Sequence, residues 1–512
     1  MNRLGNRIFS WVRRFAQNHI VVGLLLAGLS LGGRAVLLRS VPIPEPGIQD
    51  EFSYLLAADT FASGRLTNPQ HPLWIHFETV HEIMRPTYQS KYPPAQSMLL
   101  ALGQVIFGHP WFGIWLSMGA LTAAIYWALI GWLPPPWALL GGLLALSRVG
   151  FFNYWSESYW GGAVAAAAGA LVIGAVPRLT TRPTMRISLV FGIGLAVLAN
   201  SRPFEGALLG AICSGAVLVK LPGRKFVLPV TLVLVLAGFW MAYYNYRVTE
   251  SPWLLPYSVH ERQYAVSSQF FWDTQPAPTP HYNHEALRAV WIDWANGQRI
   301  NERAHPWQVR LSSFWMLNRF FLGWPTMLCV VLFLVPIFRY QPKLRLGIWL
   351  TLLYLAALQI ETTLLPHYAA PGTAFVFLLA AASLRRLWHL SPLTMILATA
   401  TILYFDYGRA ADVENRWLYD KRDFIARREA VLKQLSAAPG PHLVLVEFGP
   451  GHDVNHEWVY NRADIDASAV VWARKMRVEE DRELLMYYPS RTVWKLVERD
   501  DGVVLSVVRL PQ

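Results

Sequence analysis

Two adjacent carboxylates, Asp50 and Glu51, open the segment QDEFSYLLAADTFASG. The apolar residues that follow recur at helical spacing, and Gly64 lies where such a helix would end. A carboxylate at a helix start either caps the backbone N–H groups or serves as a general base or metal ligand. Both roles stay open for Asp50, because a cap also fixes the geometry that a base requires. Capping by Asp50 leaves Glu51 unexplained.

Further polar residues lie at the ends of apolar segments, in the motifs SKYPP, NYWSESYWGG, NSRPFEG and LPHYAAP. They are Lys91, Tyr92, Glu157, Arg202, Glu205, His367 and Tyr368. Five of them allow a structural interpretation: Glu157 as a solvated cap, Arg202 and Glu205 as an ion pair, His367 and Tyr368 as interfacial anchors. The functional alternative makes Glu157 part of a polar site and Arg202 a bidentate contact for an anion such as phosphate, with Lys91 and His367 in support.

Two groups of histidines do not predict a metal site. They comprise His71, His76 and His81, and the cluster His452, Asp453, His456 and Glu457. Neither group lies on an expected helix that would bring its members to one face, as an H-E-x-x-H zinc site requires. The chain also has no Walker A loop, no dinucleotide-binding glycine pattern and no G-x-S-x-G motif.

The composition indicates whether the chain folds in water or in a membrane. Of its 512 residues, 54% are hydrophobic and only 15% are charged, and the mean hydropathy is +0.28. This balance is typical of an integral membrane protein. The net charge of +12 does not indicate a nucleic-acid partner, because no Lys/Arg-rich run with interleaved aromatics occurs. The two cysteines lie inside apolar segments and imply no disulfide framework.

Apolar windows long enough to cross a bilayer recur along the chain. We expect about eleven spans, near residues 19–38, 110–132, 136–152, 160–177, 187–200, 204–220, 226–245, 313–338, 344–361, 368–385 and 391–407. The basic N-terminus and the long apolar run after it are expected to form a retained anchor. Lys and Arg concentrate in alternate loops, which places the N-terminus in the cytoplasm. An odd number of spans then exports the C-terminus.

Three long segments are therefore expected outside: a catalytic loop at 39–109, a loop at 246–312 and the C-terminal residues 408–512. In the last segment a charged helix at 420–438 precedes four strands, HLVLVEFG, SAVVWARKM, RTVWKLVER and GVVLSVVRL. The predicted architecture is a polytopic α-helical membrane domain at 1–407 followed by a small extracytoplasmic α/β domain at 408–512.

The order of these features resembles the GT-C superfamily of polytopic glycosyltransferases. Within it, the chain is similar to the branch of protein O-mannosyltransferases, aminoarabinose transferases and the rhizobial lipopolysaccharide glycosyltransferase-like domain. The resemblance covers roughly residues 15 to 400. The family's catalytic carboxylate falls on Asp50, with Glu51 beside it. The Lys-Pro-Pro element, the second acidic residue and the late basic-Tyr-x-x-Pro element match Lys91-Tyr92-Pro93-Pro94, Glu157 and His367-Tyr368-x-x-Pro371.

This resemblance implies transfer of a hexose or pentose from a polyprenyl-phosphate-linked donor, with inversion. The acceptor hydroxyl belongs to a glycan, lipid or protein on the outer face of the membrane. The basic, Trp-rich composition fits a bacterial inner membrane, so the expected role is cell-envelope glycan biosynthesis. Asp50 and Glu51 are the predicted catalytic residues. The other residues named above are the predicted substrate contacts. A divalent cation, Mg²⁺ or Mn²⁺, is expected, if present, on Asp50, Glu51 and Glu157.

Two other classes of membrane protein stay open. A transporter or flippase of lipid-linked glycan also needs polar groups among many spans, although transporters tend to show repeated halves and midplane charges. An O-antigen ligase or polymerase would use a lipid-diphosphate donor instead.

Overall fold

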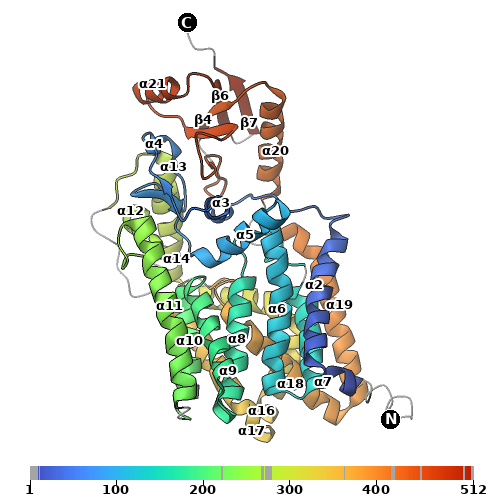
Figure 1. Cartoon of the computed structure of the whole chain (residues 1–512). Coiled ribbons are helices and arrows are strands. Elements are labelled where there is room, and N and C mark those ends of the chain that lie inside the picture. Colours follow the sequence, from blue (N-terminus) through green and yellow to red (C-terminus); the bar gives the residue numbers. More distant parts are fainter. Residues whose placement is uncertain are drawn as a thin grey trace.

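Parallel helices form most of the molecule, and the strands gather at one end of them (Figure 1). The computed structural model describes residues 10, 12–150, 152–220, 223–266, 270, 279–362, 364–416, 421–449, 452–499 and 502–508. The end of the bundle that carries the strands is called the loop face below. The predicted basic N-terminus lies partly at residues 1–9, outside the described residues.

Within the described residues, six helices are long and apolar enough to cross a membrane. They are α2 (His19–Leu37), α6 (Trp111–Trp132), α8 (Ala163–Thr181), α11 (Arg224–Thr249), α16 (Gly323–Tyr340) and the stretch Pro342–Ile360, which contains α17 (Pro342–Ala357). Further helices are α7 (Pro135–Ala145), α9 (Met185–Ala199), α10 (Pro203–Leu218), α15 (Pro306–Phe321), α18 (Thr373–Leu390) and α19 (Pro392–Arg416). Each of the eleven expected segments contains a helix, so the polytopic helical class is confirmed.

Three helix boundaries differ from the expectation. The window 313–338 holds two helices, because the chain turns at Gly323, whose φ of +67° favours glycine. Helix α7 ends in a π-helical turn at Leu146–Gly150, and α19 continues to Arg416, past the expected end at 407.

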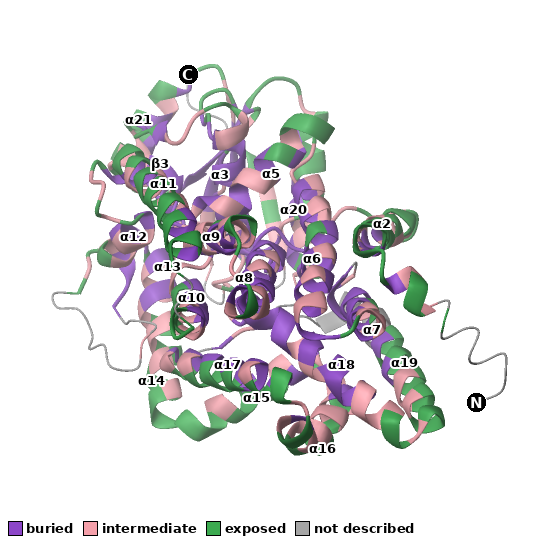
Figure 2. Ribbon diagram, turned by 60° about the horizontal axis from the view of Figure 1, so that its bottom comes forward, coloured by how far each residue is buried: buried purple, intermediate pink, exposed green. Residues whose placement is uncertain are grey.

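Helices α6 and α8 occupy the centre of the bundle. Their most apolar windows are 67% and 72% buried, against 17% for α11 and 11% for α16, and Figure 2 shows the same contrast between the centre and the edge. Small residues allow this close packing: a Cβ on Gly169 of α8 would lie 2.0 Å from the carbonyl oxygen of Pro371. The exposed apolar faces of the outer helices are suited to lipid contact.

The first long loop folds into a compact layer on the loop face. It consists of α3 (Gln49–Ala62), β1 (Asn68–Pro69), α4 (Trp74–Phe77), β2 (Glu82–Ile83), β3 (Thr87–Ser90) and α5 (Pro94–Phe107), with the strands antiparallel in the order β1-β3-β2. The second loop holds α12 (Pro256–Tyr264), α13 (Glu285–Arg288), the π-helix η2 (Ala289–Asn296) and α14 (Gly297–Ala304).

The C-terminal residues form an α/β unit on the far side of α3 from the bundle (Figure 1). Its elements are α20 (Arg422–Ala437), β4 (His442–Phe448), β5 (Val470–Arg474), α21 (Val478–Tyr487), β6 (Thr492–Arg499) and β7 (Gly502–Val507). The sheet order is β5-β4-β6-β7, with only the β6–β7 pair antiparallel in this sheet of described strands. The predicted small sheet is confirmed; the division into domains and the exported location stay predictions.

Candidate active site

A cavity of about 1100 Å³ opens at the loop face. Helix α3, the start of α5, the α9–α10 turn, α12, η2, α14 and the segment before α18 all contribute to its walls. Seven of the predicted site residues line it: Asp50, Lys91, Tyr92, Arg202, Glu205, His367 and Tyr368. Glu51 and Glu157 are not among its lining residues.

Asp50 is the second residue of α3, and its side chain turns to the cavity instead of capping the helix. The helix begins after Ile48, and Glu51 accepts the backbone N–H of Ile48 at 3.2 Å, so the interpretation of Asp50 as the N-cap is wrong. The hydroxyl of Tyr92 donates to Asp50 Oδ1. Burial raises the pKa of Asp50, against the hydrogen bond from Tyr92 and the charge of Lys91. A carboxylate with a raised pKa is suited to accept a proton near neutral pH.

The side chain of Glu51 is fully buried. Among the described residues, its carboxylate oxygens are bound by other groups of the protein. Both of its carboxylate oxygens lie 2.8 Å from Nζ of Lys421, at the start of the C-terminal unit. It also accepts the backbone N–H groups of Gly47 at 2.9 Å and Tyr159 at 3.2 Å. The prediction of Glu51 as a catalytic residue is therefore corrected: Glu51 anchors the helix end that carries Asp50.

We expect Lys421→Met to destabilise the protein by about 3 to 5 kcal/mol, because Glu51 would stay buried without its counter-charge. Glu51→Gln should cost less, since the Lys421 side chain is 20% exposed and can turn to water. Thermal unfolding of the two variants in the same detergent checks this order. Equal losses would show that Lys421 is not the group that neutralises Glu51.

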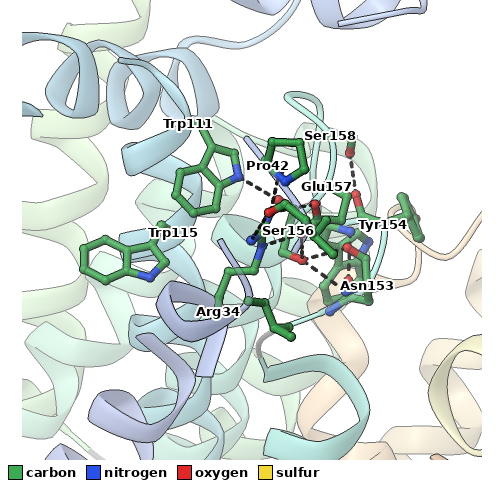
Figure 3. Close-up of polar contacts among 12 residues, drawn as sticks. Arg34, Pro42, Trp111, Trp115, Asn153, Tyr154, Ser156, Glu157 and Ser158 are labelled. Carbon is green, nitrogen blue, oxygen red and sulfur yellow. Dashed lines mark hydrogen bonds and ion pairs between the residues drawn. The ribbon is translucent and has the colours of Figure 1, made fainter. Parts of the chain in front are cut away.

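Glu157 belongs to a separate polar cluster, which Figure 3 shows around Arg34 of α2. Arg34 donates to both of its carboxylate oxygens, at 2.8 and 2.9 Å, and Ser156 donates a third hydrogen bond at 2.8 Å. The Arg34 guanidinium also donates to the carbonyl of Pro42 at 3.1 Å and lies 4.9 Å from the ring centre of Trp111. The expectation that Glu157 contacts substrate is corrected: it holds the first span to the 152–162 loop.

Arg34→Met should lower the free energy of unfolding by up to about 3 kcal/mol, because it leaves the largely buried Glu157 carboxylate without its counter-charge. The double variant Arg34→Met/Glu157→Gln should recover part of this loss. Melting temperatures of the two preparations measure the effect. A large fall in activity of Glu157→Gln at an unchanged melting temperature would return Glu157 to the site.

Lys91 lies in the cavity wall with its charge already balanced. Its Nζ is 3.4 Å from Oε1 of Glu261 and lies 4.8 Å and 5.2 Å from the ring centres of Tyr257 and Trp291. Burial lowers the pKa of Lys91, against the charges of Glu261 and Asp50. An anionic ligand would therefore compete with Glu261 for this ammonium group.

Arg202 lies at the start of α10 and faces the same cavity. Its Nη1 is 3.9 Å from Oε1 of Glu205, and the guanidinium lies 5.0 Å from the ring centre of Tyr368. Arg299 of α14 also lines the cavity. His367 contacts the Tyr154 hydroxyl at 3.1 Å, and burial together with Arg202 lowers its pKa well below the usual range. His367 therefore contributes a neutral imidazole to the cavity wall. Lys91, Arg202 and Arg299 contribute positively charged side chains.

The three carboxylates expected to hold a divalent cation do not fit a shared metal site. Among the described residues, no group of three His, Cys, Asp or Glu side chains is placed to bind a metal. Lys421 neutralises Glu51 and Arg34 neutralises Glu157, while Asp50 accepts a hydrogen bond from Tyr92. The three carboxylates are therefore not available together as ligands for Mg²⁺ or Mn²⁺.

Several cavity residues were not predicted from the sequence. His81 lies 3.7 Å from Asp50, and the second loop supplies Tyr257, Glu261, Trp291 and Arg299. The richness of that loop in Trp, Tyr and His is typical of a segment at the headgroups, so its composition alone does not separate anchors from site residues. Glu261 is one of six acidic residues in the loop 246–312, so its charge does not single it out either.

No protein-family model matches the chain, and the curated proteins contain no match. Among solved structures, ArnT from Cupriavidus metallidurans bound to undecaprenyl phosphate is similar, with a TM-score of 0.52 and 12% identity. That match covers 96% of this chain and 94% of ArnT. AglB from Archaeoglobus fulgidus, in complex with an inhibitory peptide and a dolichol-phosphate, has a TM-score of 0.46 and 10% identity, covering 94% of this chain and 69% of AglB.

The oligosaccharyltransferase of Archaeoglobus fulgidus was also solved in complex with Zn and sulfate; its TM-score is 0.48 at 12% identity, covering 94% of this chain and 67% of that one. ArnT and AglB are both GT-C superfamily glycosyltransferases. The likeness to ArnT along nearly the whole of both chains establishes that this chain has the GT-C fold. The fold implied by the sequence resemblance is thus confirmed.

Proposed function

We propose that this protein is a membrane glycosyltransferase. It transfers a sugar from a polyprenyl-phosphate-linked donor to an acceptor hydroxyl, with inversion, at the outer face of a bacterial inner membrane. The main support is one cavity that combines the partly buried carboxylate of Asp50 with the cations Lys91, Arg202 and Arg299. The GT-C fold agrees with this chemistry, and the similar ArnT structure contains undecaprenyl phosphate.

The chemistry follows from the two kinds of charge in the cavity. Asp50 accepts the proton of the acceptor hydroxyl while the hydroxyl oxygen forms a bond to the anomeric carbon. The bond between that carbon and the phosphate oxygen breaks, and the polyprenyl phosphate leaves with the electron pair. Lys91, Arg202 and Arg299 stabilise the negative charge on the leaving group. Attack opposite to the leaving group inverts the anomeric configuration.

The partners follow from the position of the cavity. Its place at the end of the spans allows the isoprenoid of the donor to stay in the membrane while the phosphate meets the cations. The acceptor is a glycan, lipid or protein that reaches the loop face, and Asn455 shows that the C-terminal unit contributes to the cavity wall. With the cytoplasmic N-terminus expected from the positive loops, this face is periplasmic.

Reconstituted vesicles test the proposal against a flippase. Purified protein is incorporated into vesicles with a polyprenyl-phosphate sugar labelled on the sugar, and a membrane extract supplies the acceptor. We expect the labelled sugar to move from the lipid donor to the acceptor. We expect no labelled intact donor on the opposite leaflet. Movement of intact donor across the bilayer, with no cleavage, would identify a transporter instead.

A further inference from the structure

His81 lies between α4 and β2 and faces the cavity. Its backbone has a φ of +66°, a conformation that residues other than glycine adopt at a cost in energy. Two hydrogen bonds hold this backbone: its carbonyl accepts from Ser53 Oγ at 2.7 Å and from the N–H of Lys91 at 3.2 Å. The strained residue is therefore fixed to the helix that carries Asp50 and to the segment that carries Lys91.

The ring of His81 is aimed at the carboxylate of Asp50. Its Nε2 lies 3.7 Å from Asp50 Oδ1, the same oxygen that accepts the hydroxyl of Tyr92. The rings of Tyr92 and Trp291 lie 5.7 Å from the His81 ring and limit its rotation. From the described residues, no hydrogen bond reaches Oδ2 of Asp50. His81 and Tyr92 thus both contact Oδ1 of Asp50, and Oδ2 is left to face a ligand.

The surroundings of His81 also determine where its proton lies. Burial, with the charges of Lys91 and His260, lowers the pKa of His81 well below the usual range, so the imidazole is neutral. Nδ1 is buried without a hydrogen-bond partner among the described residues. A proton on Nδ1 would have no acceptor, whereas a proton on Nε2 faces the Asp50 carboxylate. We therefore assign the ring proton to Nε2.

We propose that His81 is a positioning residue for Asp50: with substrate bound, its Nε2–H donates to Oδ1 beside the Tyr92 hydroxyl, so that Oδ2 faces the acceptor hydroxyl. At 3.7 Å the dipole of the Nε2–H already favours the charged form of the Asp50 carboxylate, and the contact shortens to hydrogen-bond length on substrate binding. The role of Oδ2 as the base rests on the proposed function, whereas the contact between His81 and Asp50 does not.

Other charged groups also shift the pKa values of Asp50 and His81, and they affect any measured pH profile. Lys91, Arg202 and Glu51 act on Asp50. Lys91 and His260 act on His81, and Glu261 lies 3.6 Å from His260 Nδ1. Variants at His81 leave all of these groups in place.

The matched variants His81→Gln and His81→Met separate positioning from packing. The two side chains are similar in length and carry the same backbone cost at a positive φ, but only Gln keeps an N–H donor near the position of Nε2. We expect Met to lower kcat about tenfold with little change in KM, since one hydrogen bond to a charged group is lost. The acidic limb of its kcat profile should move to higher pH by about one unit, because the carboxylate has lost a donor that stabilises its charged form. Gln should stay near the wild type in both respects.

A second readout does not require transfer activity. A hydrophobic carbodiimide reacts with protonated carboxyl groups, and peptide mass spectrometry measures labelling of Asp50 as a function of pH. The midpoint should move to higher pH in His81→Met and in Tyr92→Phe, and stay near the wild-type value in His81→Gln. Equal midpoints in the Gln and Met variants would overturn the role of His81. If the wild-type protein transfers no sugar while the midpoints still shift, the proposed function is wrong and the contact stands.

Discussion

Replacing Asp50 by Asn should slow the release of polyprenyl phosphate by about 10²- to 10⁴-fold, the contribution expected of a positioned general base. Asn keeps the shape of the side chain and can still accept the hydroxyl of Tyr92, but its amide cannot take a proton from the acceptor. The rate is measured per folded protein, with saturating donor.

The melting temperature of Asp50→Asn supplies the control. Burial disfavours the charged carboxylate, so the neutral amide should not lower stability. Because the pKa of Asp50 is raised and the base must be deprotonated, the wild-type rate should fall as the pH drops, with a midpoint above the reference value of 3.8. A folded Asp50→Asn variant with a near-normal rate would remove Asp50 from the reaction.

Arg202→Ala should weaken binding of polyprenyl phosphate about ten- to a hundredfold, because one charge-assisted contact is worth roughly 1.5 to 3 kcal/mol. Arg202→Lys should recover only part of this, since an ammonium cannot bind two phosphate oxygens side by side. Binding is measured by titration of the lipid into purified protein in detergent micelles.

Glu205→Gln is the matched control for Arg202. It removes the partner that lies 3.9 Å from the guanidinium but leaves the guanidinium free to meet phosphate. If Arg202 only balances Glu205, both variants should lower the melting temperature and neither should change the affinity for the lipid. Unchanged affinity in folded Arg202→Ala would exclude it from the donor site.

Composition and charge placement were sufficient to predict the helical membrane class and the face of the bundle that carries the cavity. Asp50, Lys91 and Arg202 stand out as charged residues beside apolar segments on the face expected outside, and all three line the cavity. The break at Gly323 was missed because the apolar run continues on both sides of it, although a glycine two residues before Pro325 was a signal.

The partners of the other acidic residues could not be predicted from local sequence. Glu51 pairs with Lys421, 370 residues away, and Glu157 pairs with Arg34, 123 residues away. The local sequence around an isolated carboxylate is the same whether that carboxylate contacts substrate or pairs with a distant cation. The pairing depends on the three-dimensional packing, which the local sequence does not contain. His81 was missed for the same reason: it was considered only as a metal ligand with His71 and His76, that role was discounted, and nothing local points to Asp50.

The central claim is that the cavity cleaves a lipid-monophosphate sugar, and a comparison of donors tests it most directly. Purified wild-type protein is given an acceptor extract with either a polyprenyl-phosphate sugar or a polyprenyl-diphosphate sugar, and the released lipids are quantified by mass spectrometry. We expect polyprenyl phosphate to accumulate from the first donor in equal amount to glycosylated acceptor, with the second donor unchanged. Consumption of the diphosphate donor alone would indicate a ligase or polymerase, and consumption of neither donor by the folded protein would contradict the proposed function.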